Sequence, residues 1–116
     1  MVSLPPPSLE SIKALLQSRP TGNIQPLLEP IGIDFFIWTA HKSGFVVPFD
    51  WMTEYPAGPP SHPHDLASLS LEQLHLLLIA HIRNDRFNEG HLTKMYRNGD
   101  LNRLLDSLQA RALGTG

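Results

Sequence analysis

The sequence of 116 residues contains no cysteine, which excludes disulfides, thiolate nucleophiles and every zinc site that needs sulfur. It also lacks a basic excess, since nine Lys and Arg residues against eleven Asp and Glu residues give a net charge of −2. Because nucleic-acid binders usually gather basic residues on one face, we expect no nucleic-acid partner. A cysteine-free chain fits a reducing compartment, and we expect a cytoplasmic protein.

Long apolar runs are missing as well. The longest covers residues 76–80, far short of the roughly 20 residues that cross a bilayer, so we expect no membrane association. The first residues lack the basic and apolar regions of a secretory signal. There is no G-x-S-x-G elbow and no phosphate-binding glycine loop, so we expect no cofactor and favour a non-enzymatic role.

Proline divides the chain into two halves. All eleven prolines lie at or before Pro63, and proline interrupts helices, so the first half can hold only short elements. Helical spacing predicts one helix that starts after Ser8 and ends before Pro20, and another at 33–43 with Gly44 in a left-handed conformation after its end. Asp50 is placed to cap a short turn at 51–54.

The second half is predicted to be almost entirely helical. Ser70 and Gln73 have the spacing of a capping box, and the helix that follows, at 71–83, is apolar on nearly every face. We therefore expect it to be the buried centre of the fold. Asn88 is predicted to cap a further short helix, and Asp100 the last one, which carries a stripe of leucines.

Together these patterns predict a mainly α protein: a compact bundle of about five short helices around the central helix at 71–83. One domain is expected to cover residues 1–116. Within it, residues 1–7 would form a flexible arm, 56–70 a long loop and 112–116 a frayed tail.

The densest polar cluster spans residues 83–91, directly after the most apolar helix. In a structural interpretation, which we favour, Arg86 pairs with Glu89, Asp85 and Asn88 cap helix starts, and Phe87 fills the core. In a functional interpretation, Arg83 and Arg86 form a fork that holds an anion. Glu89 and His91 would then be acid–base groups.

Histidines and aromatic residues give weaker signals. His62 and His64 suggest a metal, but their spacing matches no ligand pattern and their proline-rich loop does not preorganise them, so we expect no metal site. The other histidines, at positions 41, 75, 81 and 91, lie at helix positions where capping or packing explains them. Trp51 follows Asp50 and is interpreted as a buried core residue and not as an exposed recognition surface.

Two segments, 44–51 and 82–92, resemble a bacterial and partly phage-borne family of unknown function. Its members carry a G-[FW]-V-x-P-F-D-W stretch, then R-x-D-R-F-x-E-G and a leucine-rich C-terminal helix, and the resemblance covers roughly residues 33–108. It implies no activity, but it implies that the turn at Asp50 lies beside the segment 83–89, with Asp50 facing an arginine. The signature positions that it marks are Pro48, Phe49, Asp50, Trp51, Arg83, Asp85, Arg86, Phe87, Glu89 and Gly90.

The sequence thus favours a small protein-binding module. A phage-encoded member would contact a host protein such as a component of a defence system, and the apolar helix at 71–83 also permits a homodimer. The alternative is an enzyme or small-ligand binder with an anion-binding pocket built from Asp50, Arg83, Arg86, Glu89 and His91. The candidate binding residues are Asp50, Trp51, Arg83, Asp85, Arg86, Glu89 and His91.

Overall fold

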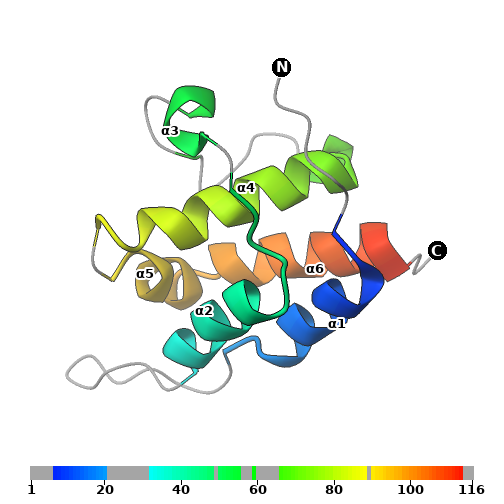
Figure 1. Cartoon of the computed structure of the whole chain (residues 1–116), viewed down its shortest axis with the longest axis horizontal. Coiled ribbons are helices and arrows are strands. Elements are labelled where there is room, and N and C mark those ends of the chain that lie inside the picture. The colour runs from blue at the N-terminus through cyan, green and yellow to red at the C-terminus, as the bar shows by residue number, and fades with distance from the viewer. Residues whose placement is uncertain are drawn as a thin grey trace.

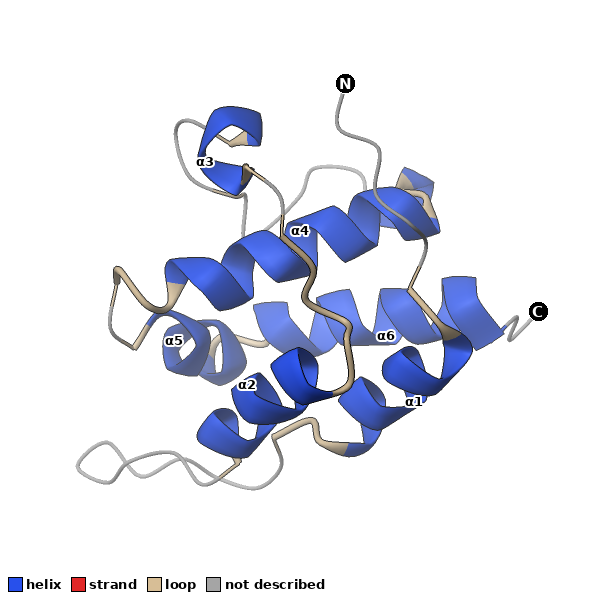
Figure 2. Cartoon of the chain, viewed as in Figure 1, coloured by secondary structure: helices blue, strands red, loops and turns tan. Residues whose placement is uncertain are grey.

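The computed structural model describes residues 7–20, 32–48, 50–55, 59, 66–88 and 90–113, without the side chains of Trp51, Glu54 and Ala67. This part of the chain contains six α-helices, one 3-10 helix and no strand (Figures 1 and 2). The elements are α1 (Leu9–Gln17), α2 (Ile33–Lys42), α3 (Trp51–Glu54), η1 (Leu66–Ser68), α4 (Leu71–Asn84), α5 (His91–Arg97) and α6 (Asp100–Leu113). Because α3 is a single turn, the predicted mainly α bundle of about five helices is confirmed.

Helix α4 lies at the centre of the bundle, as predicted. It begins with the expected capping box: the Ser70 hydroxyl accepts from the Gln73 N–H at 3.1 Å, and the Gln73 side chain accepts from the Ser70 N–H at 2.8 Å. Every residue from 74 to 82 is buried, and α3, α5 and α6 pack against this helix. The helix that is apolar on nearly every face is therefore covered by other helices on several sides.

The core is one cluster of apolar side chains from α1, α2, α4, α5 and α6. Helix α6 runs alongside α4, and α1 packs against both α6 and α2 (Figure 1). The predicted leucine stripe of α6 is buried, at Leu101, Leu104, Leu105 and Leu108. Full burial of each such side chain contributes about 1.5–3 kcal/mol to the hydrophobic stabilisation.

The short elements of the first half also form as predicted. Ser8 caps α1 by accepting from the Ser11 N–H at 3.1 Å, and Gly44, with φ of 85°, follows the end of α2. The chain then crosses α4 to reach α3 (Figure 1). This crossing is fixed to α4, because the His75 Nε2–H donates to the Phe45 carbonyl at 2.7 Å and the two rings meet edge to face.

The starts of α5 and α6 differ from the prediction. Gly90, with φ of 84°, precedes α5, and the backbone carbonyl of Asn88 accepts from the His91 N–H at 3.0 Å, so a capping side chain of Asn88 was the wrong assignment. Asp100 is the first residue of α6, and the Asn98 side chain accepts from its N–H at 3.1 Å. Both differences arise from tight turns, whose backbone geometry brings other acceptors to the helix start.

The predicted loop at 56–70 contains the short helix η1, and α6 continues to Leu113. The rest of that loop, apart from Pro59 and residues 69 and 70, and the ends at 1–6 and 114–116 lie outside the described residues, as do His62 and His64. None of the helices in the described part of the chain has the length and apolarity that crossing a membrane requires.

Candidate functional site

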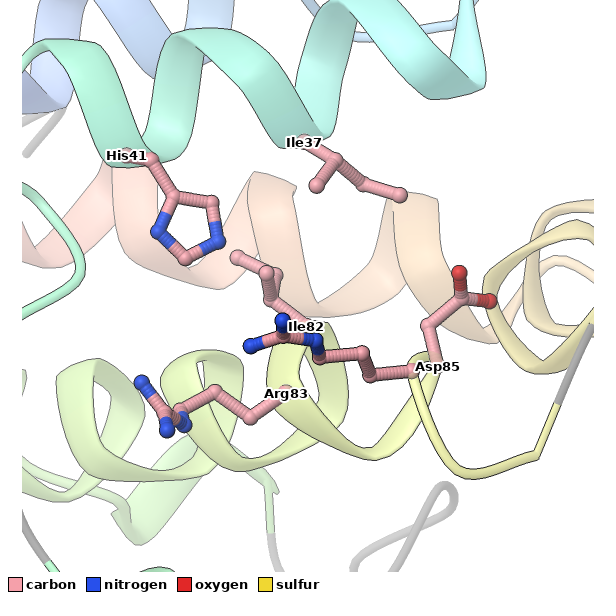
Figure 3. Close-up of a pocket in the computed structure, with 6 residues that line it drawn as sticks. Ile37, His41, Ile82, Arg83 and Asp85 are labelled. Atoms are coloured by element: carbon pink, nitrogen blue, oxygen red, sulfur yellow. The ribbon is translucent and has the colours of Figure 1, made fainter.

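A pocket of about 200 Å³ opens between α2 and the C-terminal end of α4 (Figure 3). Its apolar wall consists of Ile37 from α2 and Ile82 from α4. Its polar groups are His41 from α2, Arg83 from α4, and Asp85 and Arg86 from the turn that follows α4. The pocket therefore combines three of the predicted candidate residues, Arg83, Asp85 and Arg86, with a histidine from another helix.

Both arginines offer free donors to this pocket. Arg86 follows Arg83 by three positions, in the turn after α4, and both side chains line the pocket. Within the described part of the chain, neither guanidinium makes a hydrogen bond or an ion pair. Each guanidinium carries five N–H donors in a planar fork that suits a carboxylate or phosphate.

His41 lies across the pocket from Arg83, on the opposite helix (Figure 3). Partial burial lowers the pKa of its imidazole, and the positive charges of Arg83 and Arg86 lower it further. The ring is therefore mostly neutral at pH 7. Because its pKa depends on the charges around it, an anion between the arginines would raise the pKa of His41.

Asp85 lines the pocket but also holds the fold together. Its Oδ1 accepts from the Leu92 N–H at 3.0 Å, which satisfies one of the free donors at the start of α5. The predicted capping role of Asp85 is thus confirmed, with Leu92 as its partner. In the part of the chain that the structure covers, no ion pair joins this carboxylate to Arg83 or Arg86.

His91 is paired inside the fold. Its Nε2 lies 2.9 Å from Nδ1 of His81, and the two rings stack with centroids 5.1 Å apart. One of these nitrogens must donate and the other accept, so the pair holds a shared proton. His81 is fully buried, and burial lowers the pKa of His91 despite the nearby carboxylate of Asp85. His91 therefore connects the start of α5 to α4.

Asp50 caps α3, as predicted. Its Oδ1 accepts from the Thr53 N–H at 3.3 Å and its Oδ2 from the Thr53 hydroxyl at 2.6 Å, and these bonds lower the pKa of the carboxyl group. Helix α3 does pack against α4, but no ion pair between Asp50 and an arginine occurs among the described residues. Glu89, Phe49 and the side chain of Trp51 lie outside them.

Phe87 does not fill the core, because 68% of its surface is exposed. The turn after α4 directs it outward, so this part of the structural interpretation is wrong. Sequence reasoning also missed Ile37 and His41 as pocket residues. Their spacing of four shows that they share a face of α2, but it does not show that this face looks toward the end of α4.

The outer face of α2 carries two further aromatic residues that sequence reasoning did not single out. Phe35 and Trp38 are 58% and 57% exposed, and their rings stack with centroids 6.0 Å apart and an angle of 18° between their planes. Large aromatic side chains usually bury most of their surface. This pair is therefore the second unusual feature of the α2 region, next to the pocket.

Comparison with known families assigns residues 23–112 to the family described as "Family of unknown function (DUF6508)". Since the match covers most of the chain, this protein belongs to that family. The resemblance to a family of unknown function is thus confirmed, whereas the bacterial or phage origin and the individual motifs stay predictions. Searches of curated proteins and of solved structures find no match.

Proposed function

We propose that this member of the family is a binding module whose ligand carries a carboxylate or phosphate group, received by Arg83 and Arg86 in the pocket between α2 and α4. The observation that carries the proposal is that two guanidinium groups line one pocket without an anionic partner in the described part of the chain. Unpaired arginines in a hollow with an apolar wall favour an incoming anion, because charge-assisted bonds are stronger there than in open water.

An enzyme receives less support from the same geometry. The enzyme hypothesis required Asp50, Arg83, Arg86, Glu89 and His91 to converge. Asp50 bonds instead to Thr53, and His91 to His81, so these two groups already have partners elsewhere. Glu89 lies outside the described residues. His41 and Asp85 are then the groups in the pocket lining that come closest to the role of an acid or base.

The wider hypotheses are independent of the pocket. An origin in a bacterium or phage, contact with a host protein, a cytoplasmic location and a homodimer all stay predictions. The pocket requires only a ligand with an accessible negative group, which could belong to a small molecule or to another protein.

Titration with inorganic phosphate and with acetate tests this proposal. The amide signals of residues 37–41 and 82–86 are followed by NMR, with Lys13→Gln as a control that removes one exposed positive charge from α1. We expect saturable shifts confined to these residues, with dissociation constants on the order of millimolar, because two charge-assisted bonds give only about 3–6 kcal/mol before the cost of association. The double variant Arg83→Gln/Arg86→Gln should lose the shifts, and shifts that survive it would contradict the proposal.

A further inference from the structure

The stacked pair Phe35 and Trp38 adjoins the pocket along α2. Trp38 directly follows Ile37 and lies three residues before His41, and both of these residues line the pocket. Side chains three positions apart on a helix are surface neighbours. Trp38 therefore adjoins His41, and Phe35, which stacks on Trp38, extends this exposed surface along α2, beside a pocket that carries the two guanidinium groups.

The size of the pocket limits what could cover this whole surface. At about 200 Å³ it admits a carboxylate or phosphate, but it is smaller than the roughly 300–1,000 Å³ of typical small-molecule sites. A small anion would fill it and leave the rings of Phe35 and Trp38 in water. A macromolecular ligand can reach both features at once.

Charge and composition then favour a protein over a nucleic acid. A polynucleotide needs a track of many basic residues, whereas this chain has a net charge of −2 and the pocket supplies two arginines. Trp and Arg are the residues most enriched at the energetic centres of protein interfaces. Two arginines against the single carboxylate of Asp85 leave the pocket lining with a net positive charge, which favours a partner that is acidic at this point.

We propose that the partner is an acidic segment of another protein, which places one carboxylate in the pocket between α2 and α4 and an apolar side chain against Phe35 and Trp38. This inference rests on the proposed anion-binding function and adds the class of the partner. The carboxylate would bridge Arg83 and Arg86, and the apolar side chain would remove the two rings from water.

Two synthetic peptides separate the contributions of charge and apolar contact. One has the sequence Glu-Glu-Leu-Glu-Glu-Leu-Glu-Glu, and the other carries serine in place of both leucines. Binding to the full chain is measured by NMR titration for the unchanged protein and for Trp38→Ala, Phe35→Ala and Arg86→Gln. The control Leu9→Ala removes another exposed large apolar side chain, which is 49% exposed, from α1. Circular dichroism confirms that each variant keeps its helices.

We expect the leucine peptide to bind roughly tenfold more tightly than the serine peptide, as for truncation of an interface residue of moderate weight. Trp38→Ala and Phe35→Ala should reduce that difference, Arg86→Gln should weaken both peptides, and Leu9→Ala should change neither. Because Phe35 and Trp38 are exposed, their truncation should leave folding intact.

Several results would overturn this inference while leaving the anion pocket in place. Equal affinity for both peptides, with Trp38→Ala inert, would remove the aromatic pair from the interface. Tighter binding of adenosine monophosphate than of the leucine peptide, lost in Trp38→Ala, would identify a nucleotide site. A concentration-dependent dimer that Trp38→Ala abolishes would identify a self-interface. Failure of phosphate, acetate and both peptides together would instead refute the proposed function itself.

Discussion

Two pairs of residues within the polar segment 83–91 behave in opposite ways. Asp85 and His91 have partners inside the fold, the Leu92 N–H at 3.0 Å and the His81 ring at 2.9 Å. Arg83 and Arg86 have no hydrogen-bonding or ionic partner in the described part of the chain and line a pocket instead. The first pair joins α4 to α5, and the second pair is available to a ligand.

Within this short segment, some residues are therefore expected to stabilise the fold and others to bind a ligand. Residues that satisfy buried donors should be costly to remove, because a buried group loses its partner. Substitution of residues that line a pocket without a partner should change the free energy of unfolding little, but it should weaken ligand binding. The following substitutions test that separation, from the largest expected effect to the smallest.

Substitution of His81 should destabilise the fold most. His81→Ala deletes a fully buried ring and leaves His91 without its hydrogen bond, so we expect the free energy of unfolding to fall by about 2–4 kcal/mol. Urea unfolding measures the loss. A double-mutant cycle with His91→Ala should give a coupling of at least about 0.5 kcal/mol. A cost within the range of surface substitutions would mean that the paired histidines do not lock α4 to α5.

Loss of the Asp85 carboxylate should have the next largest effect. Asp85→Ala removes the acceptor for the Leu92 N–H and should cost about 1 kcal/mol in unfolding free energy, within a range of roughly 0.5–2 kcal/mol. Asp85→Asn keeps a side-chain oxygen at the same position and should recover much of that loss. Equal instability of the two variants would attribute the effect to charge and not to the cap.

Acidification should weaken the fold through His75 and His91. Burial lowers the pKa of His75 and of His91 from the ordinary value of 6.5. Below about pH 7 the unfolded chain therefore binds more protons than the folded one, and the free energy of unfolding should fall as pH drops through 6.5 toward the lowered folded-state pKa values. His41 is exposed and contributes little, because solvent screens it.

Urea unfolding at successive pH values between 7.5 and 5 tests this dependence. The variant His75→Gln keeps a donor for the Phe45 carbonyl but does not titrate, so its stability should fall less steeply with acid. An unchanged slope would mean that His75 takes up its proton without cost in the folded protein.

The smallest effect on stability is expected for the arginines. Arg83→Gln and Arg86→Gln each break no bond to another described residue, so the free energy of unfolding should change by no more than about 0.5 kcal/mol. Lys13→Gln on α1 provides the matched loss of one charge. A cost above about 1 kcal/mol for either arginine variant would place that residue among the structural groups of the turn.

Local patterns predicted most of the helical fold. The capping box at Ser70 and Gln73, the position of Gly44 after α2 and the buried helix α4 all follow from interactions within a few residues of sequence. The first residues of α5 and α6 did not: Gly90 precedes α5 where Asn88 was expected to cap it, and the Asn98 side chain accepts from the Asp100 N–H where Asp100 was expected to cap α6. Sequence spacing alone does not fix the backbone path through the turns before these helices.

Part of the candidate site could be predicted from the sequence. The spacing of Arg83 and Arg86 indicated an anion fork, but their position in an open pocket depends on which face of α2 looks toward the end of α4. Sequence spacing therefore did not identify His41 as a pocket residue. The outward direction of Phe87 and the meeting of His81 with His91 likewise depend on the path of the turn, which brings residues ten positions apart into contact.

The pKa of His41, measured by NMR with and without phosphate, tests the central claim most directly. It should lie below 6.5, rise in Arg83→Gln/Arg86→Gln, and rise in the unchanged protein when phosphate neutralises the arginines. Phosphate should have little further effect on the double variant, and Lys13→Gln should behave like the unchanged protein. A His41 pKa that responds neither to phosphate nor to loss of both arginines would contradict the account of an open, positively charged pocket.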